Sequence, residues 1–223
     1  MLPTCRLLIV FPSVAGSSTA GRDEERRSSP LTIGVLALQG DFREHIAIVR
    51  QLGVEAVPVK RPEELATVAG LIIPGGESSV IDKLSRLFGM AEPLRSAIAS
   101  GLPVYGTCAG LIMLADTALD AIDGQQTLGG FDLVVRRNAF GSQLDSFEID
   151  LDVPVLGTPA VHAVFIRAPV VESLGPKATS LASLPDGRVV AVEQDNLLGT
   201  SFHPEMTGDT RFHDYFLQKV RTA

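Results

Sequence analysis

The chain has 223 residues, 45% of them apolar, which is enough for one domain with a sizeable core. Its formal net charge of −7 and its lack of any Lys/Arg cluster argue against nucleic acid or an anionic membrane as a partner, since phosphate binding needs clustered positive charge. Two cysteines, Cys5 and Cys108, exclude a disulfide framework and favour a reducing, cytoplasmic setting, and no apolar run approaches the ~18 residues needed to span a bilayer.

The first thirty residues differ from the rest of the chain in their pattern of apolar and charged residues. Residues 7–11 form a short apolar patch that ends at Pro12, and a Ser/Gly/Ala stretch and a run of charges follow. A secretory signal needs a longer apolar core, of roughly 7–15 residues. We therefore expect residues 1–30 to be a disordered N-terminal extension, or to reflect a wrongly chosen upstream start codon, and residues 31–223 to form a single domain.

From residue 31 the chain alternates between strand and helix patterns. The continuous apolar run 31–38 predicts a strand buried on both faces of a parallel sheet. A helix should follow, capped by Asp41 with Glu44 completing a capping box, and ended by Gly53. Its core face is indicated by apolar residues at helical spacing, which are Phe42, Ile46, Val49 and Leu52.

The next segments repeat this alternation. Residues 55–60 and 70–76 predict two further strands, and residues 78–101 predict a helical stretch that breaks near Gly89 and Pro93.

A fourth strand is predicted over residues 102–108, and a helix should begin at Ala109. Repeated strand–helix units of this kind indicate a parallel sheet with helices on both faces. Ligands of such sheets bind beyond the carboxyl ends of the strands, so chemistry is expected at that edge.

After Leu128 helical segments become sparse. Strand-like patterns occupy residues 131–137, 145–153, 163–168, 179–184, 188–194 and 197–202, and a closing helix is predicted over 210–220. We interpret most of these as antiparallel strands that lie beside the main sheet or extend it. The predicted fold class is α/β, with an open, largely parallel sheet flanked by helices and additional antiparallel strands in the second half.

The pattern Gly106-Thr107-Cys108-Ala109-Gly110 places a cysteine in the turn between a strand and a helix. This arrangement has the mechanics of the G-x-S-x-G elbow of serine hydrolases, which exposes a nucleophile at the rim of the sheet. The start of the following helix favours the thiolate, which is the nucleophilic form of cysteine. The alternative is a buried structural cysteine, which is common.

A thiolate nucleophile needs a proton carrier, and four histidines are available. His45 and His213 fall within predicted helices and look like ordinary helix positions, and His162 begins a strand-like run. His203 follows a buried strand, and Glu205 is held close to it by the intervening proline. A carboxylate on one ring nitrogen orients an imidazole, so the sequence predicts a Cys108–His203–Glu205 triad and no metal site.

Glycines after the third strand could complete such a site. Backbone N–H groups of the Gly75-Gly76 turn, and of Ala109 after the nucleophile, can point at a developing oxyanion. The alternatives are a phosphate-binding turn or a plain strand–helix connection. A thiolate, a histidine and an oxyanion hole together predict acyl transfer through a thioester, with hydrolysis of an amide or ester.

The chain resembles a known family at this point. Gly-x-Cys-x-Gly with a late His-x-Glu is similar to the class I (triad) glutamine amidotransferases. The segments GVLALQGDFREH, IIPGGESS, YGTCAGLI, RRNAFGSQ, FIRAP and SFHPE resemble, more closely, the glutaminase subunit of pyridoxal 5'-phosphate synthase. The likeness extends over nearly all of residues 31–220, and Ile112 stands where other class I glutaminases usually have glutamine.

The resemblance implies that Cys108 attacks the side-chain amide of L-glutamine, that His203 carries the proton, and that Glu205 orients His203. It also implies a set of residues that contact glutamine, namely Gly76, Glu77, Ser78, Arg137, Ile166 and Arg167. A guanidinium suits a carboxylate, which supports Arg137 or Arg167 from the residues alone.

The same resemblance implies a partner. Ammonia should pass to a (β/α)8-barrel synthase subunit, which combines it with a pentose phosphate and a triose phosphate and assembles into a ring carrying the glutaminase subunits. Gln39 falls in the matching interface region, and Ser142 replaces a basic residue common in the family. No cofactor or metal is implied for this chain.

Three alternatives stay open. The chain could be a class I glutaminase that feeds a different synthase, or a cysteine hydrolase of similar sheet topology. It could also be a non-catalytic scaffold subunit with a glutaminase fold, although the intact Cys108, His203 and Glu205 argue against this.

Overall fold

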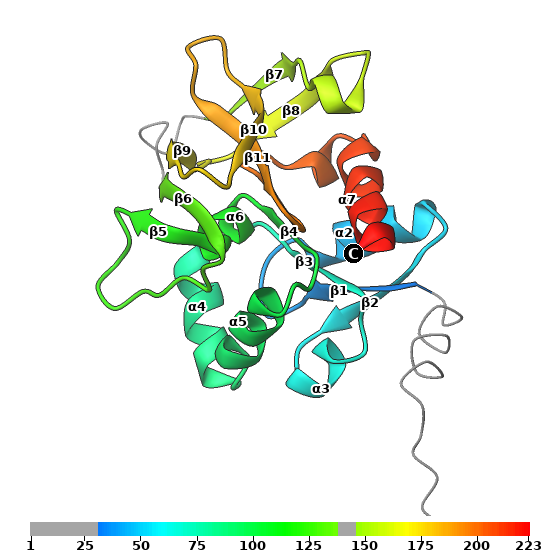
Figure 1. Ribbon diagram of the computed structural model, residues 1–223, viewed down its shortest axis with the longest axis vertical. Coiled ribbons are helices and arrows are strands. Elements are labelled where there is room, and N and C mark those ends of the chain that lie inside the picture. Colours follow the sequence, from blue (N-terminus) through cyan, green and yellow to red (C-terminus); the bar gives the residue numbers. More distant parts are fainter. Residues whose placement is uncertain (1–30, 138–145) are drawn as a thin grey trace, which may run out of the picture. The chain divides into compact units, whose positions relative to one another are not determined.

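The structure, a computed structural model, describes residues 31–137 and 146–223 (Figure 1). The predicted N-terminal extension and Ser142 therefore lie outside the described residues. Residues 31–223 cluster as one compact unit.

A long sheet forms the centre of this unit, with the strand order β2-β1-β3-β4-β12-β11-β9-β6-β5 and with β10 paired to β11. Its strands are β1 (Thr32–Leu36), β2 (Glu55–Val59), β3 (Gly70–Ile73), β4 (Val104–Thr107), β5 (Ala115–Leu119), β6 (Phe131–Arg136), β9 (Val170–Leu174), β10 (Thr179–Ser183), β11 (Val189–Gln194) and β12 (Leu197–Thr200). A separate antiparallel pair consists of β7 (Phe147–Leu151) and β8 (Val161–Phe165).

The first five strands in the order, from β2 to β12, are all parallel to their neighbours. Strands β11, β9 and β6 then extend the sheet by antiparallel pairing, as does β10 beside β11. The fold class predicted from the sequence is confirmed. One detail differs, because β5 and β6 in the second half pair in parallel.

Helices cover both faces of the sheet. They are α2 (Phe42–Gln51), α3 (Pro62–Leu65), α4 (Ser78–Leu87), α5 (Ala91–Ala99), α6 (Ala109–Leu114) and α7 (Arg211–Thr222), with 3-10 turns η1 (Pro154–Leu156) and η2 (Pro204–Met206). Figure 1 shows α2 and α7 together on one side and α4 and α5 on the other. Each side has its own apolar core, one around Phe216 and Ile72, the other around Leu94 and Leu71.

Several local predictions need correction. Asp41 occupies the N-cap of α2 but makes no side-chain capping hydrogen bond. The helical stretch breaks at Gly89, whose φ of 67° ends α4, whereas Pro93 lies inside the first turn of α5, where its missing N–H is tolerated. Strands β5 and β9 and helix α3 were not predicted. The β5 segment, ADTAL, has only one β-branched residue and no aromatic residue, so little in it is typical of a strand.

The pairing of β4 with β12 decides where the site forms. Thr107 lies opposite Thr200 in this parallel pair, and the N–H of Cys108 donates to the carbonyl of Thr200 at 2.8 Å. Both strands end at the same edge, so the residues that follow them, Cys108 and His203, emerge side by side. Within the described residues, no helix is long and apolar enough to cross a membrane.

Candidate active site

Cys108 lies in the turn between β4 and α6 with φ of 48° and ψ of −103°. Residues with a side chain seldom adopt a positive φ, and such strain is concentrated at functional sites. The thiol is free and the residue is 5% exposed.

The two glycines of the elbow allow α6 to lie directly on the sheet. A Cβ on Gly106 would stand 2.6 Å from the backbone of Gly110, and a Cβ on Gly110 would overlap the carbonyl oxygen of Ile73 in β3. Any larger residue would push the helix, and Cys108 with it, away from the strand ends. The elbow therefore requires glycine at these two positions for close packing of α6 on the sheet.

His203 and Glu205 follow β12, and both are at least nine-tenths buried. The Nδ1 of His203 and the Oε1 of Glu205 form a hydrogen bond of 2.6 Å, and the backbone N–H of His203 is anchored on the carbonyl of Val164 at 2.9 Å. The backbone turn at Pro204 thus presents the carboxylate to the imidazole, as the sequence predicted.

The other side of the His203 ring faces Cys108, the predicted nucleophile. Burial opposes a charge on His203, but hydrogen bonds to Cys108 and Glu205 outweigh it and raise the pKa of the imidazole from 6.5 to about 10. The structure therefore brings the three predicted triad residues together and favours a protonated His203 beside the sulfur.

Gly75 is needed for this arrangement. A Cβ at this position would lie 2.5 Å from Cε1 and 3.0 Å from Nδ1 of His203, and 3.6 Å from Cβ of Cys108. The glycine turn after β3 therefore lies against both the His203 and the Cys108 side chains. Gly76 has a φ of 130°, and Ala109 is the first residue of α6, where an N–H has no acceptor within its own helix.

A pocket of about 230 Å³ opens onto Cys108 and His203. Its lining includes all six residues predicted to contact glutamine: Gly76, Glu77, Ser78, Arg137, Ile166 and Arg167. Among the described residues, Gln39, Asp41 and Ile112 complete the lining. Glu205 is not exposed in the pocket and lies behind His203.

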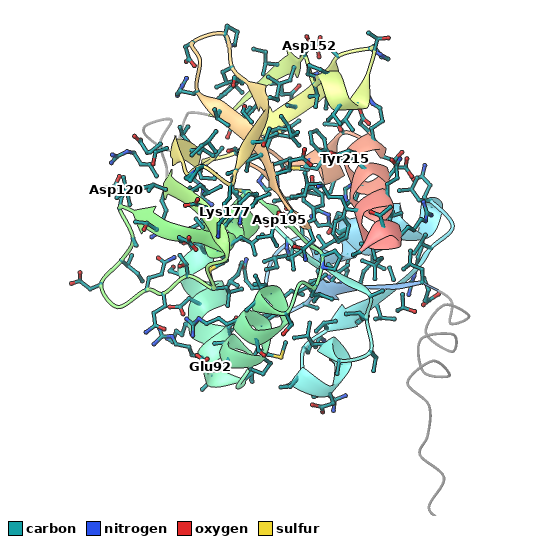
Figure 2. The ribbon with its side chains drawn as sticks, viewed as in Figure 1. Glu92, Asp120, Asp152, Lys177, Asp195 and Tyr215 are labelled. Atoms are coloured by element: carbon teal, nitrogen blue, oxygen red, sulfur yellow. The ribbon has the colours of Figure 1, made fainter. Side chains whose placement is uncertain are left out.

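A salt bridge between Arg137 and Glu77 lies in this pocket. Nη2 of Arg137 donates to Oε1 of Glu77 at 2.7 Å, and the Arg137 side chain is 8% exposed while that of Glu77 is 44% exposed. Nη1 of Arg137 donates to Gln125 at 3.0 Å and to the carbonyl of Asp120, whose place after β5 is labelled in Figure 2. These contacts fix the guanidinium at the pocket wall.

Gln39 is tied to the same wall, because its Oε1 accepts the backbone N–H of Glu77 at 2.9 Å. A Cβ on Gly76 would overlap the Gln39 amide at 2.5 Å. Gln39, which the resemblance places in the interface region, thus also packs on the glycine turn beside Cys108.

The described residues contain one group that could hold a metal ion, formed by Asp41, His203 and Glu205 with potential ligand atoms within 4.8 Å of one another. Two of these side chains are already bonded to each other, so an ion would have to disrupt the His203–Glu205 hydrogen bond. We do not assign a metal to it.

The interpretation of His45 and His213 as ordinary helix positions is wrong. Both are 0% exposed, and their Nδ1 and Nε2 atoms lie 2.8 Å apart behind Glu205. The spacing of His45 with Ile48 and Val49, which are the buried residues of α2, was the available signal. His162, on β8, is exposed and pairs with Asp150 and Glu148 of the neighbouring strand β7, and it does not line the pocket.

A buried cysteine at a strained elbow, beside a histidine that is hydrogen-bonded to a carboxylate, on a parallel sheet, defines the class of cysteine-dependent amidohydrolases and acyltransferases. The model of the SNO glutamine amidotransferase family matches residues 35–222. The chain belongs to the SNO glutamine amidotransferase family, in agreement with the resemblance seen in the sequence.

Curated relatives support this assignment. A protein of Leifsonia xyli subsp. xyli, called pyridoxal 5'-phosphate synthase subunit PdxT, is 71% identical over 188 residues, which cover 84% of this chain and 95% of that protein. A protein of the same name from Clavibacter michiganensis subsp. michiganensis is 64% identical over 92% of this chain and 98% of its own length.

Solved structures agree with the fold. A structure described as a glutamine amidotransferase superposes with a TM-score of 0.79 at 46% identity, covering 85% of this chain and 98% of that one. A glutamine amidotransferase from Thermotoga maritima superposes with a TM-score of 0.56 at 13% identity, covering 87% of this chain and 85% of that one, and shares the fold alone.

Proposed function

We propose that the protein hydrolyses L-glutamine to glutamate and ammonia and delivers the ammonia to a partner subunit for the synthesis of pyridoxal 5'-phosphate. The observation that carries the chemistry is the contact of His203 with both Cys108 and Glu205 at the base of the pocket. The family and the curated names of the relatives support the substrate and the pathway.

Cys108 is the nucleophile of this reaction. Its sulfur attacks the side-chain amide carbon of glutamine, and the carbonyl oxygen becomes an oxyanion, which the N–H groups of Gly76 and Ala109 stabilise. His203 gives its proton to the leaving nitrogen, the carbon–nitrogen bond breaks, and ammonia departs. A glutamyl thioester remains on Cys108.

Water completes the cycle. His203, now neutral, takes a proton from a water molecule that attacks the thioester carbon. The carbon–sulfur bond breaks, glutamate leaves, and the Cys108–His203 pair returns to its starting state. Glu205 keeps the imidazole oriented and supports its positive charge in both halves of the reaction.

The charges of the pocket complement free glutamine. The α-carboxylate fits the guanidinium of Arg137, which can bind two oxygens at once, and the α-ammonium fits Glu77. Bound glutamine would thus break the Glu77–Arg137 salt bridge, and its α-ammonium would contact Glu77 while its α-carboxylate contacts Arg137. Ser78, Ile166 and Arg167 line the rest of the pocket and are proposed to contact the substrate.

The partner is proposed to be a (β/α)8-barrel synthase subunit that forms a ring carrying the glutaminase subunits. The relatives are themselves called subunits of a synthase. Gln39, which packs on the turn beside Cys108, would link docking of the partner to the oxyanion hole. A cytoplasmic location is proposed because the nucleophile must stay reduced.

Glutamate release should be measured with and without the cognate barrel subunit. Wild type should form glutamate in the presence of the partner, and Cys108→Ala should not. Replacing the second cysteine, Cys5→Ala, serves as the matched control and should keep the activity. Release that depends on a different synthase would instead favour a glutaminase of another pathway.

A glutamine-mimicking electrophile, 6-diazo-5-oxonorleucine, identifies the nucleophile independently. It should add one mass equivalent to wild type and to Cys5→Ala and none to Cys108→Ala. Absence of labelling at Cys108 with the partner present would contradict the proposed mechanism.

A further inference from the structure

Two buried histidines lie behind the predicted triad. His45 belongs to α2 and His213 to α7, 168 residues apart, and neither side chain is exposed. Nδ1 of His45 and Nε2 of His213 form a hydrogen bond of 2.8 Å. Neither residue lines the pocket, so the reaction as written above does not use them.

His45 is the link between this pair and the triad. Its Nε2 faces Oε2 of Glu205 at 3.5 Å and the hydroxyl of Thr107 at 3.3 Å. The other carboxylate oxygen, Oε1, is occupied by His203. Oε2 is fully buried and has no hydrogen-bond partner of normal length among the described residues. A buried carboxylate oxygen without a donor is unfavourable, which makes the nearby imidazole nitrogen significant.

The number of protons decides which of the two ring nitrogens, His45 Nδ1 or His213 Nε2, is the donor. Only one proton fits between His45 Nδ1 and His213 Nε2. If it belongs to His45, then Nε2 of His45 turns a lone pair toward the carboxylate, and the proton of neutral His213 lies on its buried Nδ1, which has no acceptor among the described residues. If it belongs to His213, then His45 presents an Nε2–H to Glu205, which supplies the donor that Oε2 lacks. The second arrangement removes the repulsion between the lone pair and the carboxylate.

We propose that His45 is a positioning residue of the glutaminase, whose Nε2–H holds Oε2 of Glu205 while His213 keeps the opposite ring nitrogen in its acceptor form. The proposal rests on the proposed function of the triad. It extends the chain of contacts from Cys108 through His203 and Glu205 to the two buried histidines.

The surrounding charges fit a neutral donor. Burial, together with the nearby His213 and His203, lowers the pKa of His45 well below 6.5. Burial lowers the pKa of His213 to about 4, against a smaller opposing effect of Asp209. A neutral His45 can orient Glu205 without competing with His203 for its negative charge. Tyr105, whose ring edge meets His213, completes the groups around the pair.

The simpler alternative is that the two histidines only fasten α2 to α7. Nitrogen NMR of the full wild-type chain labelled with 15N-histidine separates the two ideas, and a variant is needed only to assign the signals. His45, assigned by comparison with His45→Gln, should be neutral near pH 7 with its proton on Nε2. A proton on Nδ1 would overturn the proposal.

Kinetics provide the second test, on the complex with the barrel subunit. His45→Gln keeps a donor near the position of Nε2, whereas His45→Asn keeps only a polar atom near Nδ1. The Asn variant should lose at least about tenfold in kcat with KM changed less than about twofold, and the Gln variant should stay within about threefold of wild type. Equal losses in the two variants would show a purely structural role.

The alkylation of Cys108 by iodoacetamide, followed against pH, reports on the triad even where no glutamine is hydrolysed. In His45→Asn the acid limb of this profile should move up by about one pH unit, because a loosened Glu205 supports the positive charge of His203 beside the sulfur less. An unchanged profile would refute the proposal. Failure of wild type to hydrolyse glutamine would refute the proposed function instead.

Discussion

Replacing His213 with glutamine should reduce the loss of folding stability that we expect in mild acid. Burial holds the pKa of His213 at about 4, whereas the unfolded chain has an ordinary histidine near 6.5. Between these two pH values, His213 is therefore protonated in the unfolded state and neutral in the folded state. The stability that this group contributes is complete above about pH 6.5 and is lost as the pH falls toward 4.

The size of the effect follows from these two pKa values. Between about pH 7.5 and about pH 5, His213 alone should lower the free energy of unfolding by about 2 kcal/mol. His45, whose pKa is also lowered, acts in the same direction. His203 has a raised pKa and acts in the opposite direction, but both proteins retain it, so it cancels in the comparison.

Urea unfolding followed by circular dichroism at several pH values measures the difference, since the chain has no tryptophan for fluorescence. His213→Gln should lose about 2 kcal/mol less than wild type over this range. His162→Gln is the matched control, because hydrogen bonds that His162 donates to Asp150 and Glu148 raise the pKa of this exposed histidine, so its removal should not reduce the acid loss. An acid loss in His213→Gln equal to that of wild type would refute the reasoning.

Three further predictions concern the pocket and its support. Gly75→Ala should lower kcat by about 100-fold or more, since the new Cβ would displace His203; steady-state glutaminase kinetics would contradict this by showing an unchanged kcat. Arg137→Lys should raise KM for glutamine about tenfold or more with a small change in kcat, because lysine lacks the guanidinium fork; an unaltered KM would remove Arg137 from the substrate site. Phe202→Ala should lower the free energy of unfolding by about 3–5 kcal/mol, since this fully buried ring packs on Phe165 and Phe212; urea titration showing less than about 1 kcal/mol would argue against that packing.

Much of the first half of the fold follows from local sequence patterns. The apolar runs that become β1, β3 and β4 are each flanked by glycines or helix starts, and every residue of β3 and β4 is buried. A strand buried on both faces needs continuous apolar residues, so its sequence is easy to recognise. The strands of the second half are harder to predict from sequence. Strands such as β5 and β9 contain polar residues, and their extended conformation depends on pairing with other strands and not on a local apolar pattern.

The predicted site shows the same division. The elbow at Cys108 and the short His203–Glu205 spacing are local, since each depends on neighbouring residues, and both could be identified without coordinates. Asp41 shows the limit of a local rule, because a residue with the right identity at the N-cap makes no side-chain capping bond.

Sequence alone thus predicted the parallel core, and it placed the proposed nucleophile beside its nearest partners, through periodicity, glycine placement and the spacing of a few residues. Only the tertiary structure decided that β4 lies beside β12, that Glu77 meets Arg137, and that His45 meets His213 behind Glu205. The physical reason is that these contacts join segments that lie far apart in the chain. Their geometry depends on how whole strands and helices pack, and residue patterns within one segment carry no record of that packing.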